Sequence, residues 1–125
     1  MTSVADWVDK AEADWIGAVA LNRRRRIPLP DLVCFHCQQC AEKYLKAFLV
    51  KHRQTPPRVH DLTGLLDRCG ELDPLLAVLA PLLGPLNAFA VAARYPDVAT
   101  SDADAKQAIT ATRMVRRVLR KTLGL

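Results

Sequence analysis

Apolar residues recur along this chain every three or four positions, the spacing that places them on one face of an α-helix. The first series runs from Val4 to Val19 and follows a Ser-x-x-Asp sequence, Ser3 to Asp6, that is typical of a capping box. We predict a helix over residues 3–26. Its four final arginines would complement the negative end of the helix before a Pro-rich turn stops it.

Two further helices are predicted from residues 31–53 and 61–69. Asp31 has the residue type of an N-cap for the first of them, and the Thr-Pro-Pro turn at 55–57 follows it. The second carries leucines at helical spacing and is expected to stop at Gly70, because glycine tolerates the left-handed conformation that often closes a helix.

The last part of the chain predicts two more helices. A Leu- and Ala-rich helix begins at Asp73, should be kinked or divided by Pro81 and Pro85, and ends near residues 94–96. The final helix, residues 101–124, opens with a second Ser-x-x-Asp box. No stretch alternates polar and apolar residues with a period of two, so we predict no sheet.

These helices, joined by short loops, predict an all-α fold, an antiparallel up-and-down bundle of four to five helices. A chain of 125 residues is sufficient for one domain, residues 1–125. The longest apolar stretch, residues 75–91, is interrupted by prolines, a glycine and an asparagine, and no basic-then-apolar leader opens the sequence. We therefore expect a cytoplasmic protein with no membrane partner.

The chain is basic, with a formal net charge of +5 and a pI near 9.3. This charge suits a polyanion such as nucleic acid, and equally it suits simple solubility. The arginine run at 23–26 can serve the helix end or dock RNA or a partner. The last helix carries a cationic stripe that is either a solvated face or a positive binding surface: Lys106, Arg113, Arg117 and Arg120, flanked by Arg116 and Lys121.

Three of the four cysteines lie in CFHCQQC, residues 34–40, either as metal ligands or as small side chains in a core. On a helix Cys34 and Cys37 are neighbours, but Cys34 and Cys40 are separated by about 9 Å of rise and about 120° of rotation. One metal ion cannot bind all three. We predict packing in the core, with no metal or cofactor and a partly exposed His36. Metal or redox sensing by Cys34 and Cys37 is the alternative.

Three motifs occur in order along the chain: FHxQQxAEKxLKA at 35–47, HDLxxLL at 60–66 and ARYP at 93–96. Together they resemble the HEPN domain (higher eukaryotes and prokaryotes nucleotide-binding) over about residues 5–122. The resemblance implies a four- to five-helix bundle that is usually a homodimer. It also implies a gene often found beside a minimal nucleotidyltransferase, with which the protein acts as a toxin–antitoxin-like pair.

Catalytic members of that family are metal-independent ribonucleases that use an arginine followed after four to six residues by a histidine. Arg94 matches the arginine, but residues 99–101 are Ala, Thr and Ser, and none of these can carry a proton near pH 7. Arg53 and His60 have a suitable spacing but flank the Pro-Pro turn instead of lying at the family position. We therefore expect no catalytic residue.

The remaining polar residues of the motifs form the candidate site. One stripe of the second helix carries Gln38, Glu42 and Lys46, which are four residues apart, with Gln39 and Lys43 beside it. These side chains either contact a phosphate or a second subunit, or Glu42 pairs with Lys46 or a neighbouring helix while the amides satisfy buried backbone groups. Arg94 either completes that site or forms an ion pair with Glu42. Tyr95 either stacks on a base or packs beside Pro96. His60 either joins the site or fixes the conformation of its loop. The candidate residues for binding nucleotide, RNA or a partner are Arg94, Tyr95, Gln38, Gln39, Glu42, Lys43, Lys46 and His60.

The resulting expectation is a non-catalytic HEPN-like binding module for a nucleotide, RNA or a nucleotidyltransferase partner. The alternative is a ribonuclease that uses Arg94 with a non-standard partner residue, or with His60 supplied by a second subunit. Exposed apolar side chains on the fourth helix would favour a dimer, and the residues in question are Leu82, Leu83, Leu86 and Phe89.

Overall fold

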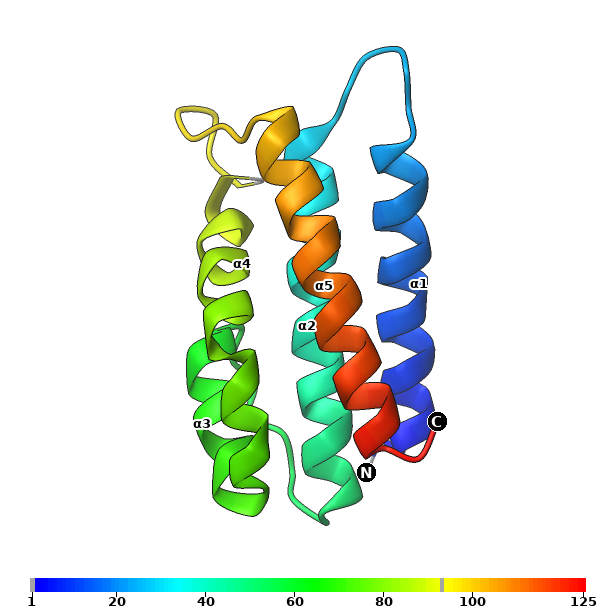
Figure 1. Ribbon diagram of the computed structural model, residues 1–125, viewed down its shortest axis with the longest axis vertical. Coiled ribbons are helices and arrows are strands. Elements are labelled where there is room, and N and C mark those ends of the chain that lie inside the picture. The colour runs from blue at the N-terminus through cyan, green and yellow to red at the C-terminus, as the bar shows by residue number, and fades with distance from the viewer. Residues whose placement is uncertain (1, 93) are drawn as a thin grey trace.

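The computed structural model describes residues 2–92 and 94–125 of the chain. Within these ranges it contains five α-helices, one 3-10 helix and no strand, which confirms the predicted all-α bundle. The helices α1, α2 and α5 run alongside one another, and α3 and α4 lie at one side (Figure 1). The elements are α1 (Val4–Asn22), α2 (Pro30–Lys51), α3 (Leu62–Leu72), the 3-10 helix η1 (Pro74–Leu79), α4 (Ala80–Ala92) and α5 (Asp102–Thr122).

Helix α1 begins as predicted but ends four residues early. The Ser3 hydroxyl accepts from the Asp6 N–H and the Asp6 carboxylate accepts from the Ser3 N–H, so the capping box is present. The helix stops at Asn22, and its last turn holds no basic residue. Farther along the loop Ile27 has φ 51°, which is incompatible with a right-handed helix. The arginines at 23–26 therefore belong to the loop, and the prediction that they complete the helix was wrong.

The prediction that Asp31 caps α2 was also wrong. The N-cap position is Leu29, no side chain caps the helix, and Pro30 begins it, which suits a residue without a backbone N–H. Asp31 Oδ1 instead accepts hydrogen bonds from Thr100, at 2.9 Å from the backbone nitrogen and 2.6 Å from Oγ1. The carboxylate thus connects the segment before α5 to the first turn of α2.

The elements between α2 and α5 follow the predictions in part. Asp61 caps α3 by accepting from the Thr63 N–H, but the helix passes through Gly70 and ends at Leu72. Asp73 then caps η1, which gives way to α4 at Ala80. The division next to Pro81 agrees with the prediction, whereas Pro85 lies inside α4 and does not divide it. At α5 the second capping box, Ser101 with Asp104, is confirmed.

Helix α2 lies at the centre of the bundle and supplies more of the core than any other helix. All four cysteines are free and buried, so the prediction that they pack in the core is confirmed. Burial raises the pKa of the Cys34 thiol to about 11 and that of Cys37 to about 12. Within residues 2–92 and 94–125, no group of three or more His, Cys, Asp or Glu side chains is arranged to hold a metal ion.

The segment Pro74–Val91 is the one described stretch that is long and apolar enough to cross a membrane, with a mean hydropathy of 1.8. Here it is divided between η1 and α4, and its buried side chains, Leu76, Leu79, Leu83 and Leu86, are part of the core. It therefore serves as one layer of the bundle.

Candidate functional site

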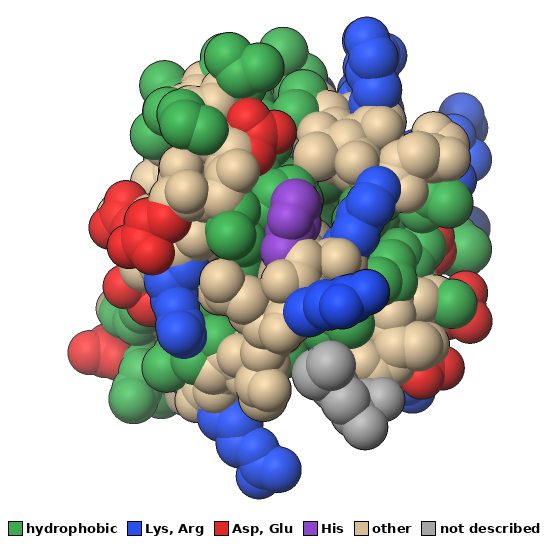
Figure 2. All heavy atoms as spheres, turned by 90° about the horizontal axis from the view of Figure 1, so that it is seen from below, with side chains coloured by type: hydrophobic (Ala, Val, Ile, Leu, Met, Phe, Trp, Pro, Cys, Tyr) green, Lys and Arg blue, Asp and Glu red, His purple; other side chains and the backbone are tan. Residues whose placement is uncertain are grey.

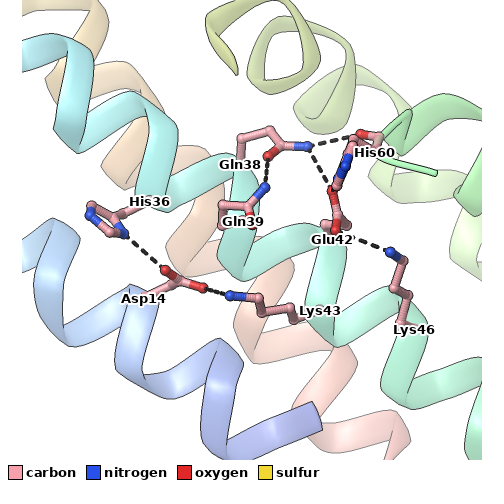
Figure 3. Close-up of polar contacts among 8 residues, drawn as sticks. All are labelled: Asp14, His36, Gln38, Gln39, Glu42, Lys43, Lys46 and His60. Carbon is pink, nitrogen blue, oxygen red and sulfur yellow. Dashed lines mark hydrogen bonds and ion pairs between the residues drawn. The ribbon is translucent and has the colours of Figure 1, made fainter. Parts of the chain in front are cut away.

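The carboxylate of Glu42 is the centre of a buried polar network on α2 (Figure 3). Its Oε1 accepts from His60 Nδ1 at 2.9 Å and from Gln38 Nε2 at 3.4 Å, and its Oε2 accepts from Lys46 Nζ at 3.1 Å. Gln38, Glu42 and Lys46 are neighbours because they are four residues apart on one helix. The expected pair of Glu42 with Lys46 is present, and both charges are almost wholly shielded from water.

The amides extend this network to the chain that leads into α3. Gln38 Nε2 donates to the backbone oxygen of His60 at 2.9 Å, and Gln39 Nε2 donates to Gln38 Oε1 at 2.7 Å. Buried amides placed in this way satisfy polar groups that would otherwise lack partners. The network holds the segment before α3 against the middle of α2.

Lys43 belongs to a different contact, between α2 and α1. It forms an ion pair with Asp14, whose other carboxylate oxygen is 2.8 Å from His36 Nδ1. This three-residue group lies on the other side of α2 from His60 (Figure 3). Lys43 is therefore separated from the other polar residues of its motif, and His36 is half-buried, as expected.

A pocket of about 320 Å³ collects a second group of the expected residues. His60 enters it from the segment before α3, and Arg94 and Tyr95 enter it from the segment after α4. A large part of the His60 and Tyr95 side chains is exposed, 61% and 56%. The other residues that line this pocket are Asp61, Asn87, Ala90 and Val91.

Asn87 places the two sides of this pocket next to each other. Its Oδ1 accepts from the Leu62 N–H at 3.0 Å, and its Nδ2 donates to Asp61 Oδ1 at 2.9 Å. The start of α3 is thereby connected to the middle of α4. Asn87 was not among the predicted site residues, although it is the one polar side chain between residues 74 and 93.

Arg94 does not pair with Glu42, because the partners of Glu42 are His60, Gln38 and Lys46. The Arg94 side chain is exposed, and within the described ranges no carboxylate lies within ion-pair distance of its guanidinium. The preceding motif residue, Ala93, lies outside the described residues. An exposed guanidinium presents a planar fork of donors that matches phosphate or carboxylate.

The pocket combines an imidazole, an amide and the guanidinium of Arg94, which has no ion-pair partner in the part of the chain that the structure describes. His60 reaches the carboxylate of Glu42 through Nδ1, and this contact orients the ring within the pocket. Such an arrangement can bind an anion by charge and by hydrogen bonds. It also provides an imidazole oriented by a carboxylate, which is a proton-transfer group in many sites.

The expected cationic stripe on α5 is partly occupied by internal contacts. Arg116 binds both carboxylate oxygens of Glu12, and Arg120 donates to the Tyr44 hydroxyl at 3.1 Å. The Arg116 hydrogen bonds lower the pKa of Glu12, and burial, with the Glu12 contact, raises the pKa of Tyr44 to about 12. Arg116 and Arg120 therefore join α5 to α1 and α2. The cations of the stripe that stay exposed are Lys106, Arg113, Arg117 and Lys121.

Comparison with known proteins gives the chain a family. A family model of the HEPN domain matches residues 4–122. The chain is also similar to the crystal structure of an archaeal HEPN homologue, with a TM-score of 0.75, 25% sequence identity and coverage of 98% of each chain. None of the curated proteins matches at a significant level. The chain belongs to the HEPN domain family.

Proposed function

We propose that this HEPN domain is a binding module that holds a phosphate group of a nucleotide or RNA in the pocket of Arg94 and His60. The observation that supports it is the exposed guanidinium of Arg94, which shares a pocket with an imidazole and has no ion-pair partner in the described chain. The exposed ring of Tyr95 offers a base a surface for stacking.

Asp61 is the one carboxylate that lines this pocket, and its contacts reduce its repulsion of an anion. Its Oδ1 accepts from the Thr63 N–H and from Asn87 Nδ2, at the positive N-terminal end of α3. Gln38, Glu42 and Lys46 act in this proposal as supports of His60, since they are buried.

The test is equilibrium binding of labelled single-stranded RNA and of ATP by the wild type, Arg94→Gln and the control Arg68→Gln. Arg68 is exposed on α3 and does not line the pocket. Loss of a charged hydrogen bond of about 1.5–3 kcal/mol predicts binding about 10- to 100-fold weaker for Arg94→Gln. Equal dissociation constants for all three proteins would contradict the proposal.

A metal-independent ribonuclease is the second candidate, favoured by the contact of His60 with Glu42 beside Arg94. His60 would take the proton of a ribose 2′-hydroxyl, the 2′-oxygen would attack phosphorus, and Arg94 would stabilise the charged phosphate while the 5′-oxygen leaves. Incubation of RNA with wild type, His60→Ala and Arg94→Gln separates the candidates. Cleavage of RNA that requires both His60 and Arg94 would show that the protein is a ribonuclease. RNA that stays intact with the wild type would favour the binding module.

We also propose that the protein is a cytoplasmic homodimer. Leu83 and Leu86 are buried and so cannot belong to the predicted dimer surface, but Leu82 and Phe89 are partly exposed. Hydrophobic side chains gather at one corner of the lower end of the bundle (Figure 2), and Leu75 and Val78 of η1 are strongly exposed. Light scattering should give a dimer mass for the wild type and a monomer mass for Leu75→Glu with Val78→Glu.

Pairing with a nucleotidyltransferase, as a toxin–antitoxin-like system, is a proposal supported by the family alone. A small nucleotidyltransferase encoded next to this chain, and its co-purification with the wild type, would support the pairing. Absence of such a neighbouring gene would count against it.

A further inference from the structure

The loop between α1 and α2 holds most of the excess positive charge of the chain. Arg23, Arg24, Arg25 and Arg26 are all exposed, and none has an ion-pair partner among the described residues. Without these four the formal net charge of +5 would be +1. Arg23 is the C-cap of α1, but the three arginines that follow it lie beyond the helix, so the helix end does not account for them.

This loop lies at the same end of the bundle as the segment that carries Arg94 (Figure 1). The two hydrogen bonds from Thr100 to Asp31 connect that segment to the first turn of α2, which directly follows the arginine loop. Both cationic elements therefore border one end of the molecule. Figure 2 shows the opposite end, where Lys and Arg side chains are spread among acidic and hydrophobic ones.

A cavity of about 200 Å³ lies between the loop and α5. Arg24 from the loop and Lys106 from α5 both line it, with Asp102 as the acidic residue. Lys106 therefore faces the same cavity as Arg24, next to the acidic first turn of α5, which holds Asp102 and Asp104.

We propose that the Arg23–Arg26 loop binds the sugar-phosphate backbone of single-stranded RNA, so that the ligand is a strand and not a free mononucleotide. The inference rests on the proposed function, because the same strand would place another phosphate at Arg94. Four successive exposed guanidinium groups offer several phosphate contacts in a row, which suits a strand with many phosphates better than a single phosphate. Guanidinium groups bind phosphate through two parallel hydrogen bonds.

The experiment measures binding of labelled oligouridine RNA by fluorescence anisotropy over a series of KCl concentrations. The loop variant carries R23Q, R24Q, R25Q and R26Q. The matched control carries K10Q, R53Q, R58Q and R68Q, four exposed cations that lie outside the α5 stripe and have no ion-pair partner in the described chain. Both variants have the same formal net charge, so the comparison separates the loop from overall charge.

Loss of four phosphate contacts should reduce the slope of log K against log [KCl] by about 3 for single-stranded RNA. We expect this reduction for the loop variant and a nearly unchanged slope for the control. Equal reductions in both variants, or an unchanged slope in the loop variant, would overturn the inference. So would ATP binding as tight as RNA binding, or loop-dependent binding to phosphatidylserine vesicles with RNA binding unaffected.

Two double variants, R23Q with R24Q and R25Q with R26Q, cover the case in which the fourfold variant does not fold. Each should lose about half of the slope change. Arg94→Gln in the same assay tests the pocket separately. If Arg94→Gln binds RNA normally while the loop variant loses its salt dependence, the proposed function fails and the loop inference stands.

Discussion

The Nδ1 atom of His60 lies 2.9 Å from the buried carboxylate of Glu42, a contact that joins the segment before α3 to the middle of α2. The same carboxylate accepts from Lys46, so Glu42 has a charged partner and a partner at the pocket. The position of the His60 ring therefore depends on a residue whose side chain is almost wholly buried.

Replacing Glu42 by Gln should destabilise the fold strongly. The Lys46 ammonium is buried, and removing its carboxylate leaves an uncompensated charge that costs about 3–5 kcal/mol. Urea unfolding followed by circular dichroism should show this loss, whereas Glu71→Gln, an exposed acid on α3, should change little. The double variant with Lys46→Met should lose less than the sum of the single variants. Strict additivity would contradict this account.

The contact between Glu12 and Arg116 should make stability depend on pH in the acid range. Hydrogen bonds from Arg116 lower the folded-state pKa of Glu12 below its ordinary value of 4.5. A carboxyl whose pKa is lower in the folded state stabilises the fold above its unfolded pKa and loses that contribution as pH falls through the folded pKa. Glu12→Gln should therefore be less stable than the wild type at pH 7, and the difference should shrink below about pH 4. A pH-independent difference would argue against the ion pair.

The cysteines should be unreactive in the folded protein. Burial raises the pKa of Cys37 and Cys69 to about 12, so the thiolate that reacts is scarce at pH 8. Titration with a thiol reagent should give very slow labelling without denaturant and rapid labelling of all four thiols in guanidinium chloride. Fast native labelling of Cys34 or Cys37 would instead favour redox sensing.

Asp31→Ala should loosen the segment that carries Arg94. The variant loses two hydrogen bonds from Thr100 to a charged oxygen, and each contributes about 1.5–3 kcal/mol to the free energy of unfolding. We expect a lower melting temperature and faster tryptic cleavage after Arg94. Asp97→Asn changes an exposed acid in the same segment and serves as the control, so equal cleavage of both variants would show that Asp31 does not restrain it.

Local signals predicted the fold well and several helix ends poorly. The capping boxes at Ser3 and Ser101 form as expected because they join residues three apart. Gly70 was expected to end α3, yet the helix continues, since glycine also adopts helical angles and Cys69 next to it packs in the core. Packing, more than the residue type at the boundary, decides such ends.

The sequence by itself determined the helices, because helical periodicity and caps depend on neighbours within a few positions. It also marked the polar residues of the three motifs as candidates for a binding site. Only the tertiary structure decided which of those residues meet. Arg116 reaches Glu12 across 104 positions and His60 reaches Glu42 across 18, while Arg94 lines the same pocket as His60 without an ion-pair partner among the described residues. The physical reason is that partners distant in sequence are chosen by how the helices pack, and the spacing of residues along the chain does not contain that information.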